Sequence, residues 1–491
     1  MRRPMLILLA VAAIAASAFT TPVTLESGPA VLTRDPGPGY FATSNIEWLG
    51  NIPVNTDSAG ARFLDGYLYI TEDRGLTIYD LSDPELPVPA GFHPLPQGPY
   101  YTEEDVDTNG EILLIGSYGD LAPNVGPLRT LYVFDVTNKN LPTLIGQVAG
   151  ADQHTVSCIL DCTWAYGSGG NIVDLRDPTS PVLQPTRWTQ APEVQAAGVN
   201  SSHDVTEVAP GIVVTSSNPV LVLDAREDPV NPKVVATGSP GDGRFIHGNL
   251  WKNGGVDEDG LLVEADDLLL VGGETFSSAC GENDGAFMTF DAREVNAETE
   301  AIRTALADGE PIPERTAGFS MLDQWRVSGS GLYADGNSPY NQYCAHWFTQ
   351  HPTWDDGGLL AMGWYEHGVR FLEVASEADA DADPDVGFGD ITEKGWFVPL
   401  GGSTSAAYWV TDEIVYTADY QRGIDILRFT DEPASDELTM VGQAQAVADR
   451  DVDPDRFFPW FGVEARLAVL DRTGLETSGG FVGCRIPVTQ V

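Results

Sequence analysis

Short apolar runs, separated by turns rich in Gly, Pro and acidic residues, follow one recurring order along the chain. Each copy reads as a strand ending in a small or polar residue, a tight turn, a second strand ending in an acid, and a turn that contains Pro. The copies occupy residues 67–87, 113–142, 164–181, 212–232, 268–294, 359–374 and 414–431. One copy can form a small antiparallel sheet but cannot bury both faces, so the copies must stack against one another. The pattern predicts an all-β fold, a seven-bladed β-propeller.

The residue that ends the third strand of each predicted blade sets the register of the repeat. These residues are Asp80, Asp135, Asp174, Asp224, Asp291 and Glu373, with Arg428 in that place in the last copy. On this register the propeller spans residues 45–436. We expect residues 45–54 to form the outermost strand of the last blade and so to close the ring. Residues 437–443 are an alternative for that role.

Three of the copies carry a likeness to a known repeat. The segments GLTIYDLSDP, GNIVDLRDP and VLVLDAREDP resemble the repeat of the LVIVD family of secreted β-propellers. The likeness covers residues 45–431 and implies the propeller fold. It implies no single chemistry, because the family is not tied to one.

The first 18 residues have the organisation of a secretory signal peptide. Arg2 and Arg3 precede an apolar run that ends near Ala16, and Ala16-Ser17-Ala18 offers a small-residue cleavage site. We therefore expect a secreted protein, extracellular or at the cell surface. No later segment is long and apolar enough to predict a membrane span.

Two further segments flank the predicted propeller. Residues 19–44 are expected to be a linker, and residues 437–491 a short C-terminal extension. Within that extension, residues 456–470 are too apolar to face water, so we expect the extension to pack on the propeller. We expect the protein to be a monomer.

The chain is strongly acidic, with 72 Asp and Glu against 26 Lys and Arg and a formal net charge of −46. Such a surface repels nucleic acid, so no nucleic-acid partner is expected. The acid-rich run 375–390 resembles a calcium loop in the spacing of its Asp residues. Because Pro384 stands where that loop needs a turning Gly, and the bidentate Glu is missing, we expect a solvated loop and no calcium there.

The cysteines suit an oxidising compartment. Cys158 and Cys162 bracket the turn of a predicted hairpin, where a bridge is sterically possible. Cys280 and Cys344 fall on the same face of neighbouring blades and are predicted to form a second disulfide. Cys484 is then left over. No pair of cysteines has the spacing of a zinc ribbon.

Four histidines stand at or near the start of predicted innermost strands in consecutive blades: His154, His203, His247 and His346. Innermost strands run in parallel around the axis, so these imidazoles are predicted to converge at the channel mouth. Clustered imidazoles suit one transition metal, copper or zinc. The alternative is that the rings hydrogen-bond to one another or to water in a polar channel. His351 is a possible fifth member, and blades without His offer Asp57, Glu104 or Asp105, and Ser405 near that level.

Three turns between second and third strands carry basic or titratable residues, at Arg74, His367 and Arg422. Together with Glu104 and Asp57 they are candidates for a ligand-binding rim, where the basic groups could clamp a carboxylate, sulfate or sugar acid. The alternative is that each pairs with a neighbouring acid such as Glu72 or Glu366.

These features favour a secreted propeller that binds a small-molecule, glycan or protein ligand at the funnel face of its channel. An alternative is a metal-dependent oxidoreductase or hydrolase that uses the histidine cluster, and another is a structural cell-surface module. The channel histidines are similar to those of the selenium-binding and methanethiol-oxidase propellers, a resemblance that implies copper. The adjacent His-His pair of those proteins is absent from this chain. No nucleophile elbow, phosphate loop or dinucleotide fingerprint is present.

Overall fold

A computed structural model of the 491-residue chain describes most of the repeat region. The described residues are 29–54, 61–72, 75–95, 102–117, 130–151, 154–274, 285–327, 345–365, 367–435 and 438–442. Strands dominate them, and the α-helices among them are α1 (Pro192–Ala196), α2 (Arg293–Asp308) and α3 (Glu377–Ala382). None of these helices is long and apolar enough to cross a bilayer.

The strands pair antiparallel, in chain order, into four-stranded units. We name each unit by its innermost strand. The first three are the β3 unit (β3 Ala61–Leu64, β4 Tyr67–Glu72, β5 Gly75–Asp80, β6 Val88–Pro94), the β7 unit (β7 Thr102–Thr108, β8 Ile112–Ser117, β9 Thr130–Asp135, β10 Thr143–Ala149) and the β11 unit (β11 Val156–Ile159, β12 Trp164–Gly167, β13 Ile172–Asp174, β14 Val182–Leu183).

Two further units share one sheet, because their outermost strands pair in parallel. They are the β15 unit (β15 Val205–Ala209, β16 Ile212–Thr215, β17 Val220–Asp224, β18 Lys233–Gly238) and the β19 unit (β19 Phe245–Leu250, β20 Leu268–Glu274, β21 Phe287–Asp291, β22 Gly318–Trp325). The remaining units are the β23 unit (β23 Phe348–Gln350, β24 Gly358–Gly363, β25 Val369–Val374, β26 Ile391–Pro399) and the β27 unit (β27 Thr404–Trp409, β28 Ile414–Asp419, β29 Gly423–Phe429, β2 Ile46–Ile52).

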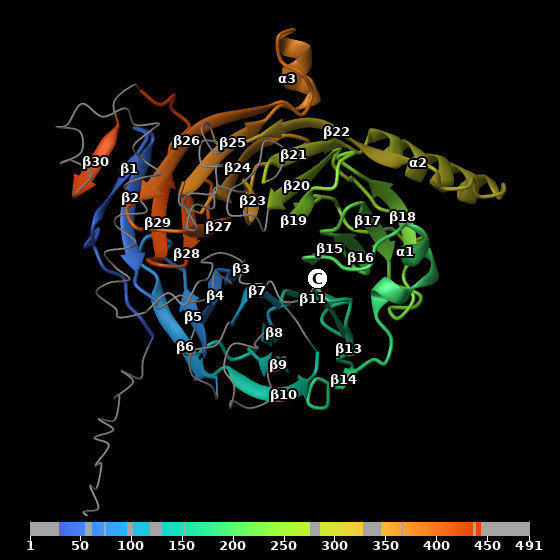
Figure 1. Ribbon diagram of the computed structural model, residues 1–491, viewed down its shortest axis with the longest axis horizontal. Helices are drawn as coiled ribbons and strands as arrows, with labels where there is room; N and C mark the ends of the chain where they lie inside the picture. Colours follow the sequence, from blue (N-terminus) through green and yellow to red (C-terminus); the bar gives the residue numbers. More distant parts are fainter. Residues whose placement is uncertain are drawn as a thin grey trace, which may run out of the picture.

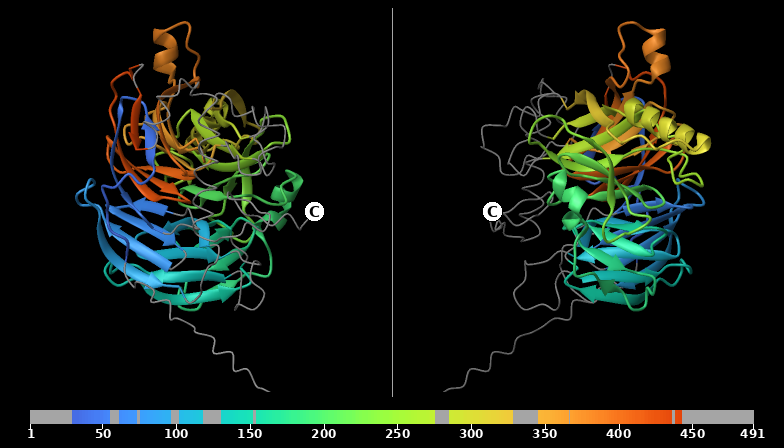
Figure 2. Two further views of the ribbon diagram at one scale, coloured as in Figure 1. Left: turned by 60° about the vertical axis from the view of Figure 1, so that its left-hand side comes forward. Right: turned by 90° about the vertical axis from the view of Figure 1, so that its right-hand side faces the viewer.

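The units stand around a common axis with their innermost strands turned toward it (Figure 1). The side views show the same sheets packed next to one another, with α3 projecting from the periphery (Figure 2). Fully buried side chains fill the space between neighbouring units, such as Tyr69 and Ile78 against Leu113 and Phe134. This arrangement is a β-propeller.

The N-terminal strand closes the ring, as the sequence predicts. β2 pairs antiparallel with β29, from Ile46 opposite Phe429 to Ile52 opposite Ile424. The alternative closing strand is wrong: β30 (Thr439–Gly442) pairs with β1 (Gly39–Ala42), which itself lies against β26. Residues 39–42, expected to be linker, therefore extend the β23 unit.

The acids that set the register cap the turns that follow them. Asp80 accepts a hydrogen bond from the backbone N–H of Ser82 at 2.8 Å, and Asp135 accepts one from Thr137 at 2.9 Å. Three copies add a fork of bonds from an Arg two residues on, which pairs Asp174 with Arg176, Asp224 with Arg226 and Asp291 with Arg293. A short acidic side chain that bonds the backbone two residues ahead stabilises a turn. The repeated acid is thus a structural residue.

One buried carboxylate ties the closing strand to the last unit. Asp425, which is fully buried, accepts hydrogen bonds from Trp48 Nε1 at 2.8 Å and Asn51 Nδ2 at 3.2 Å, both on β2. It also pairs with Arg422 through two contacts of 2.9 and 3.0 Å.

Asp425→Ala should lower the free energy of unfolding by about 3–5 kcal/mol, because it leaves the guanidinium of Arg422 without its carboxylate in a buried place. Urea unfolding followed by tryptophan fluorescence measures this. The control is Glu227→Ala, which breaks the exposed pair with Lys233 and should not move the midpoint. An equal effect of the two variants would show that Asp425 does not secure the closure.

Candidate metal centre

Side chains at the inner edge of one unit hydrogen-bond to backbone carbonyl groups at the inner edge of the following unit. Thr155 Oγ1 donates to the carbonyl of His203 at 2.8 Å, and His203 Nδ1 bonds the carbonyl of His247 at 2.9 Å. His346 Nδ1 bonds the carbonyl of Ser405 at 2.6 Å. A carbonyl oxygen can only accept, so His203 and His346 each carry a proton on Nδ1. In the neutral ring, the lone pair then lies on Nε2.

The four predicted histidines form one contiguous group, which we call the histidine arc: His154, His203, His247 and His346. The Nε2 atoms of His154 and His203 lie 3.1 Å apart. The ring centroids of His203 and His247 are 4.0 Å apart, and those of His247 and His346 are 3.9 Å apart. All four side chains are buried, none more than 5% exposed. The sequence predicted that the four rings converge on one point. In the structure they instead lie side by side, in a row.

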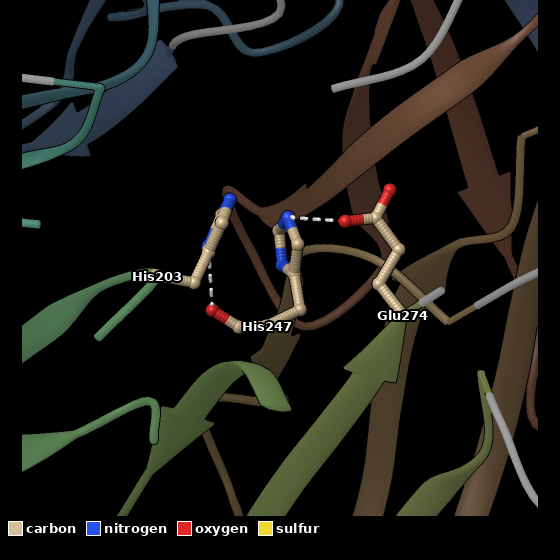
Figure 3. Close-up of side chains that lie close together, drawn as sticks. All are labelled: His203, His247 and Glu274. Carbon is tan, nitrogen blue, oxygen red and sulfur yellow. Dashed lines mark hydrogen bonds and ion pairs between the residues drawn. The ribbon is translucent and has the colours of Figure 1, made fainter. Parts of the chain in front are cut away.

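An acid completes the most compact set of possible ligands. Glu274, at the end of β20, is 1% exposed and places Oε2 3.8 Å from His247 Nε2. His203, His247 and Glu274 each offer one ligand atom, and these atoms all lie within 4.8 Å of one another. Figure 3 shows the ring of His247 turned toward the carboxylate of Glu274, with the ring of His203 beside it. Ligands of a tetrahedral zinc, each about 2.0–2.2 Å from the ion, stand roughly 3.3–3.5 Å apart, so small rotations bring this set to ligating distance.

Glu274 was missed in the sequence because it ends a second strand, where the sequence analysis expected a small or polar residue and considered no ligand. The available signal was that two other second strands also end in an acid, at Glu72 and Asp419. Its other oxygen, Oε1, accepts a hydrogen bond from the hydroxyl of Tyr365, a fully buried residue of the next unit. The carboxylate is therefore held from two sides.

His351 does not belong to the arc. It follows β23 at the far end of that strand, where its Nε2 bonds the carbonyl of Asp412 at 2.8 Å and its Nδ1 bonds Thr353 Oγ1 at 2.7 Å. Its ring packs on Trp409. Five residues after His346, the innermost strand has already carried the chain away from the arc.

The predicted basic rim differs from the structure at both described positions. His367 is buried, and its Nδ1 accepts a hydrogen bond from Arg370 at 3.2 Å. Burial, and then the charge of Arg370, lower the pKa of His367 well below its usual value, so the ring is neutral. Arg422 is turned inward to Asp425. The alternative of pairing with an acid thus holds for Arg422, with a partner that the sequence analysis did not name.

Several predicted residues lie beyond what the structure describes. Arg74 and Asp57 fall outside the described residues, and so do Cys280, Cys344 and Cys484. Glu104 and Asp105 lie in β7, whose backbone alone is described at these positions.

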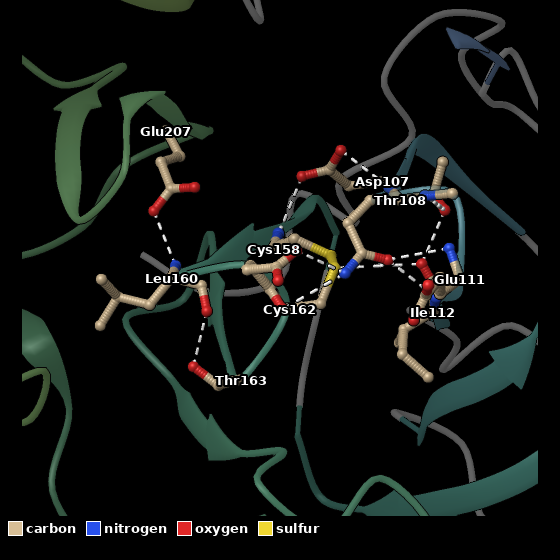
Figure 4. Close-up of a disulfide and its surroundings, with 12 residues drawn as sticks. Asp107, Thr108, Glu111, Ile112, Cys158, Leu160, Cys162, Thr163 and Glu207 are labelled. Atoms are coloured by element: carbon tan, nitrogen blue, oxygen red, sulfur yellow. Dashed lines mark hydrogen bonds between the residues drawn. A yellow bond between two sulfur atoms is a disulfide. The ribbon is translucent and has the colours of Figure 1, made fainter. Parts of the chain in front are cut away.

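The predicted hairpin disulfide Cys158–Cys162 is confirmed. It closes a turn in which Leu160, Asp161 and Cys162 all have positive φ. Neighbouring units hold this turn, since Asp107 accepts from the backbone N–H of Cys158 at 2.8 Å and Glu207 from that of Leu160 at 2.7 Å (Figure 4).

A cavity of about 80 Å³ lies within the channel. All the units contribute to its wall, which consists of Ala61, Arg62, Asp107, Ser157, Asp204, Val205, Thr206, Glu207, Asn249, Leu250, Trp347, Phe348, Thr349 and Tyr408. We call it the channel cavity. Burial raises the pKa of Asp204 to about 6 and that of Glu207 to about 7.

No protein-family model matches the sequence, and no curated protein matches it. The resemblance to LVIVD-repeat propellers therefore stays a prediction. Among solved structures, the chain is similar to the β-propeller domain of Myceliophteria thermophila Cps50 (Swd1), at 13% identity and a TM-score of 0.46, over 80% of this chain and 100% of that one. It is also similar to the WD40 β-propeller domain of Doa1, at 10% identity and a TM-score of 0.44, over 80% of this chain and 99% of that one. Likeness this remote says nothing about function.

Glu207→Gln should flatten the pH dependence of stability. The wild-type carboxyl has a pKa of about 7 in the folded protein, against an ordinary value of 4.5, so folding favours its protonated form. That contribution is complete below pH 4.5 and is lost as the pH rises through 7. The amide removes this loss and still accepts the bonds that Leu160 and Gly211 donate to Oε1.

The free energy of unfolding of Glu207→Gln, measured in urea relative to that of the wild type, should rise by about 2 kcal/mol between pH 4.5 and 7.5. Glu227→Gln, at an exposed site, is the control and should follow the wild-type profile. Parallel profiles for Glu207→Gln and wild type would contradict the buried, protonated state of Glu207.

Proposed function

We propose that this chain is a secreted, seven-bladed β-propeller that binds a transition metal, zinc or copper, at the mouth of its channel and recognises a small ligand there. The observation that carries this proposal is the buried set of His203, His247 and Glu274, whose ligand atoms lie within 4.8 Å of one another. In this reading each of the four-stranded units is one blade.

The residues present suit such an ion. Two imidazoles and one carboxylate are a common ligand set for zinc, and imidazole also suits copper. The Nδ1–H of His203 is committed to a backbone carbonyl, so its lone pair lies on Nε2. Nε2 is hydrogen-bonded to His154 Nε2 at 3.1 Å, and an ion would take the place of that hydrogen bond. A hydrogen bond like that of Nδ1 orients ligating histidines in metal proteins and fixes their tautomer. The hydroxyl of Tyr365 does the same for Glu274.

Three protein ligands leave one coordination position for another molecule. A metal bound in this way would act as a Lewis acid toward an oxygen or nitrogen atom of that molecule. His154 and His346 flank the set and can donate or accept protons beside it. The site thus supports ligand binding, with a metal-dependent oxidoreductase or hydrolase as the second candidate.

Export is the second part of the proposal. The signal-like residues 1–18 support it, and so does the Cys158–Cys162 disulfide, because such bonds persist in oxidising compartments. Copper and zinc are then available to the protein outside the cytosol, where no competing cytosolic thiols bind them.

Elemental analysis of the purified chain tests the metal. After loading with zinc or copper and removal of excess, we expect close to one ion per chain, and His247→Ala should lose it. The matched control is His351→Ala, which removes a histidine of the neighbouring unit outside the arc and should keep the ion. Because protonated imidazole cannot ligate, occupancy should fall as the pH drops below about 6.

Three results would overturn the proposal: no bound ion at neutral pH, equal loss in both variants, or full retention in His247→Ala. Binding of copper or zinc with no turnover of esters, peptides or thiols would favour the ligand-binding reading over the enzyme.

A further inference from the structure

We propose that the channel cavity is a second, separate cation site, which holds a hard divalent cation, calcium, through oxygen atoms of Asp204 and Asn249. Asp204 directly precedes β15, Asn249 lies in the adjacent innermost strand β19, and both line the cavity. The site is distinct from the acid-rich run 375–390, whose acids serve as local caps: Asp379 caps α3, and Asp390 accepts from the backbone of Gly387.

Asn249 lines the cavity with an amide side chain. Its Nδ2 donates to Ser216 Oγ at 2.8 Å and to the carbonyl of Val214 at 3.4 Å, which fixes the orientation of the side chain. The opposite atom, Oδ1, is buried, and no hydrogen-bond donor of the described residues reaches it. Asn249 as a whole is 2% exposed.

Asp204 presents a second acceptor. Its Oδ2 accepts from Thr206 Oγ1 at 3.1 Å, and the backbone N–H of Val205 and the hydroxyl of Thr155 also act on the carboxylate. Its buried Oδ1 has no donor at hydrogen-bonding distance among the described residues. The residue is 1% exposed. A buried acceptor without a donor is costly, and a cation removes that cost for both oxygens at once.

The hydroxyl groups on the wall add acceptors and few donors. Ser157 Oγ donates to the carbonyl of Val205, and Thr349 Oγ1 donates to that of Ala407 at 3.0 Å. With their protons committed to carbonyl groups, these oxygens have only lone pairs left. The wall therefore suits a species that brings positive charge.

The net charge of the wall points the same way. Asp107, Asp204 and Glu207 face one base, Arg62, which lies 3.5 Å from Asp107. Asp107 and Glu207 already accept from backbone N–H groups, so their oxygens are less available as ligand atoms than those of Asp204. A cation in the cavity would favour the ionised form of Glu207.

Size and ligand type select the ion. Calcium takes six to eight oxygen ligands in flexible geometry and keeps water among them, and a cavity of about 80 Å³ has room for an ion with several waters. Oxygen ligands alone do not suit copper or zinc as well as the nitrogen-rich set at the channel mouth. The two sites should therefore load independently.

Calorimetric titration of calcium into the chelator-treated full-length protein tests the inference. Because 72 acids give the surface a diffuse affinity for cations, the titration is run at 0.5 M salt, which screens exposed charges. Terbium serves as a luminescent substitute for calcium, and Trp347 on the cavity wall can sensitise it.

We expect one saturable site, weakened about tenfold or more in Asp204→Asn and strengthened in Asn249→Asp, which adds a charged ligand. Asp308→Asn, at the exposed end of α2, makes the same change of charge far from the cavity and should bind as the wild type does. His247→Ala should also leave this site intact, which separates the result from that of the proposed metal centre.

No saturable site in the wild type, or equal affinity in Asp204→Asn and Asp308→Asn, would overturn the inference and leave a cavity occupied by water. If Asp204→Asn fails to fold by circular dichroism, Asn249→Asp decides alone: unchanged or weaker binding in that variant contradicts a cation ligated by residue 249.

Discussion

The innermost strands have no neighbouring strand on the side that faces the axis. Their backbone N–H and C=O groups on that side must therefore find other hydrogen-bond partners. Side chains of the preceding unit supply these partners, as Thr155 does for the carbonyl of His203 and His346 does for that of Ser405. Such bonds fix the spacing of the units at the axis. They also fix the tautomers and ring positions of the arc, so the chemistry of the channel mouth depends on the same contacts that hold the ring together.

Local patterns in the sequence were enough to predict the strands, the turns and the closing strand, because each of these depends on neighbours in the chain or on a repeated position. The four arc histidines were found for the same reason, since they recur at one place in successive copies. Glu274 occupies a place that the repeat does not mark, and only the fold brings it to His247. His367 and Arg422 were predicted to be exposed because they lie in turns. In the structure both are directed into the protein, where His367 bonds Arg370 and Arg422 bonds Asp425.

Nitrogen and oxygen ligand atoms come from positions only one or two residues apart in the chain. His203 and His247 bring nitrogen, and Asp204 and Asn249, one and two residues further along their strands, bring oxygen. The same two adjacent units therefore carry both kinds of ligand atom within two residues of each other. The acidic character of the chain is thus partly internal, with carboxylates placed where they face the axis as well as the solvent.

Ring closure joins strands that lie far apart in the chain: Trp48 bonds Asp425 across 377 residues. The strand synthesised early must therefore wait, unpaired, until almost the whole repeat region has emerged. Contacts of such long range are slow to form, because the chain loses loop entropy before they can compensate it. If the chain is exported unfolded, as we propose, this delay is an advantage, since the ring cannot close until the strands of the β27 unit have also crossed the membrane.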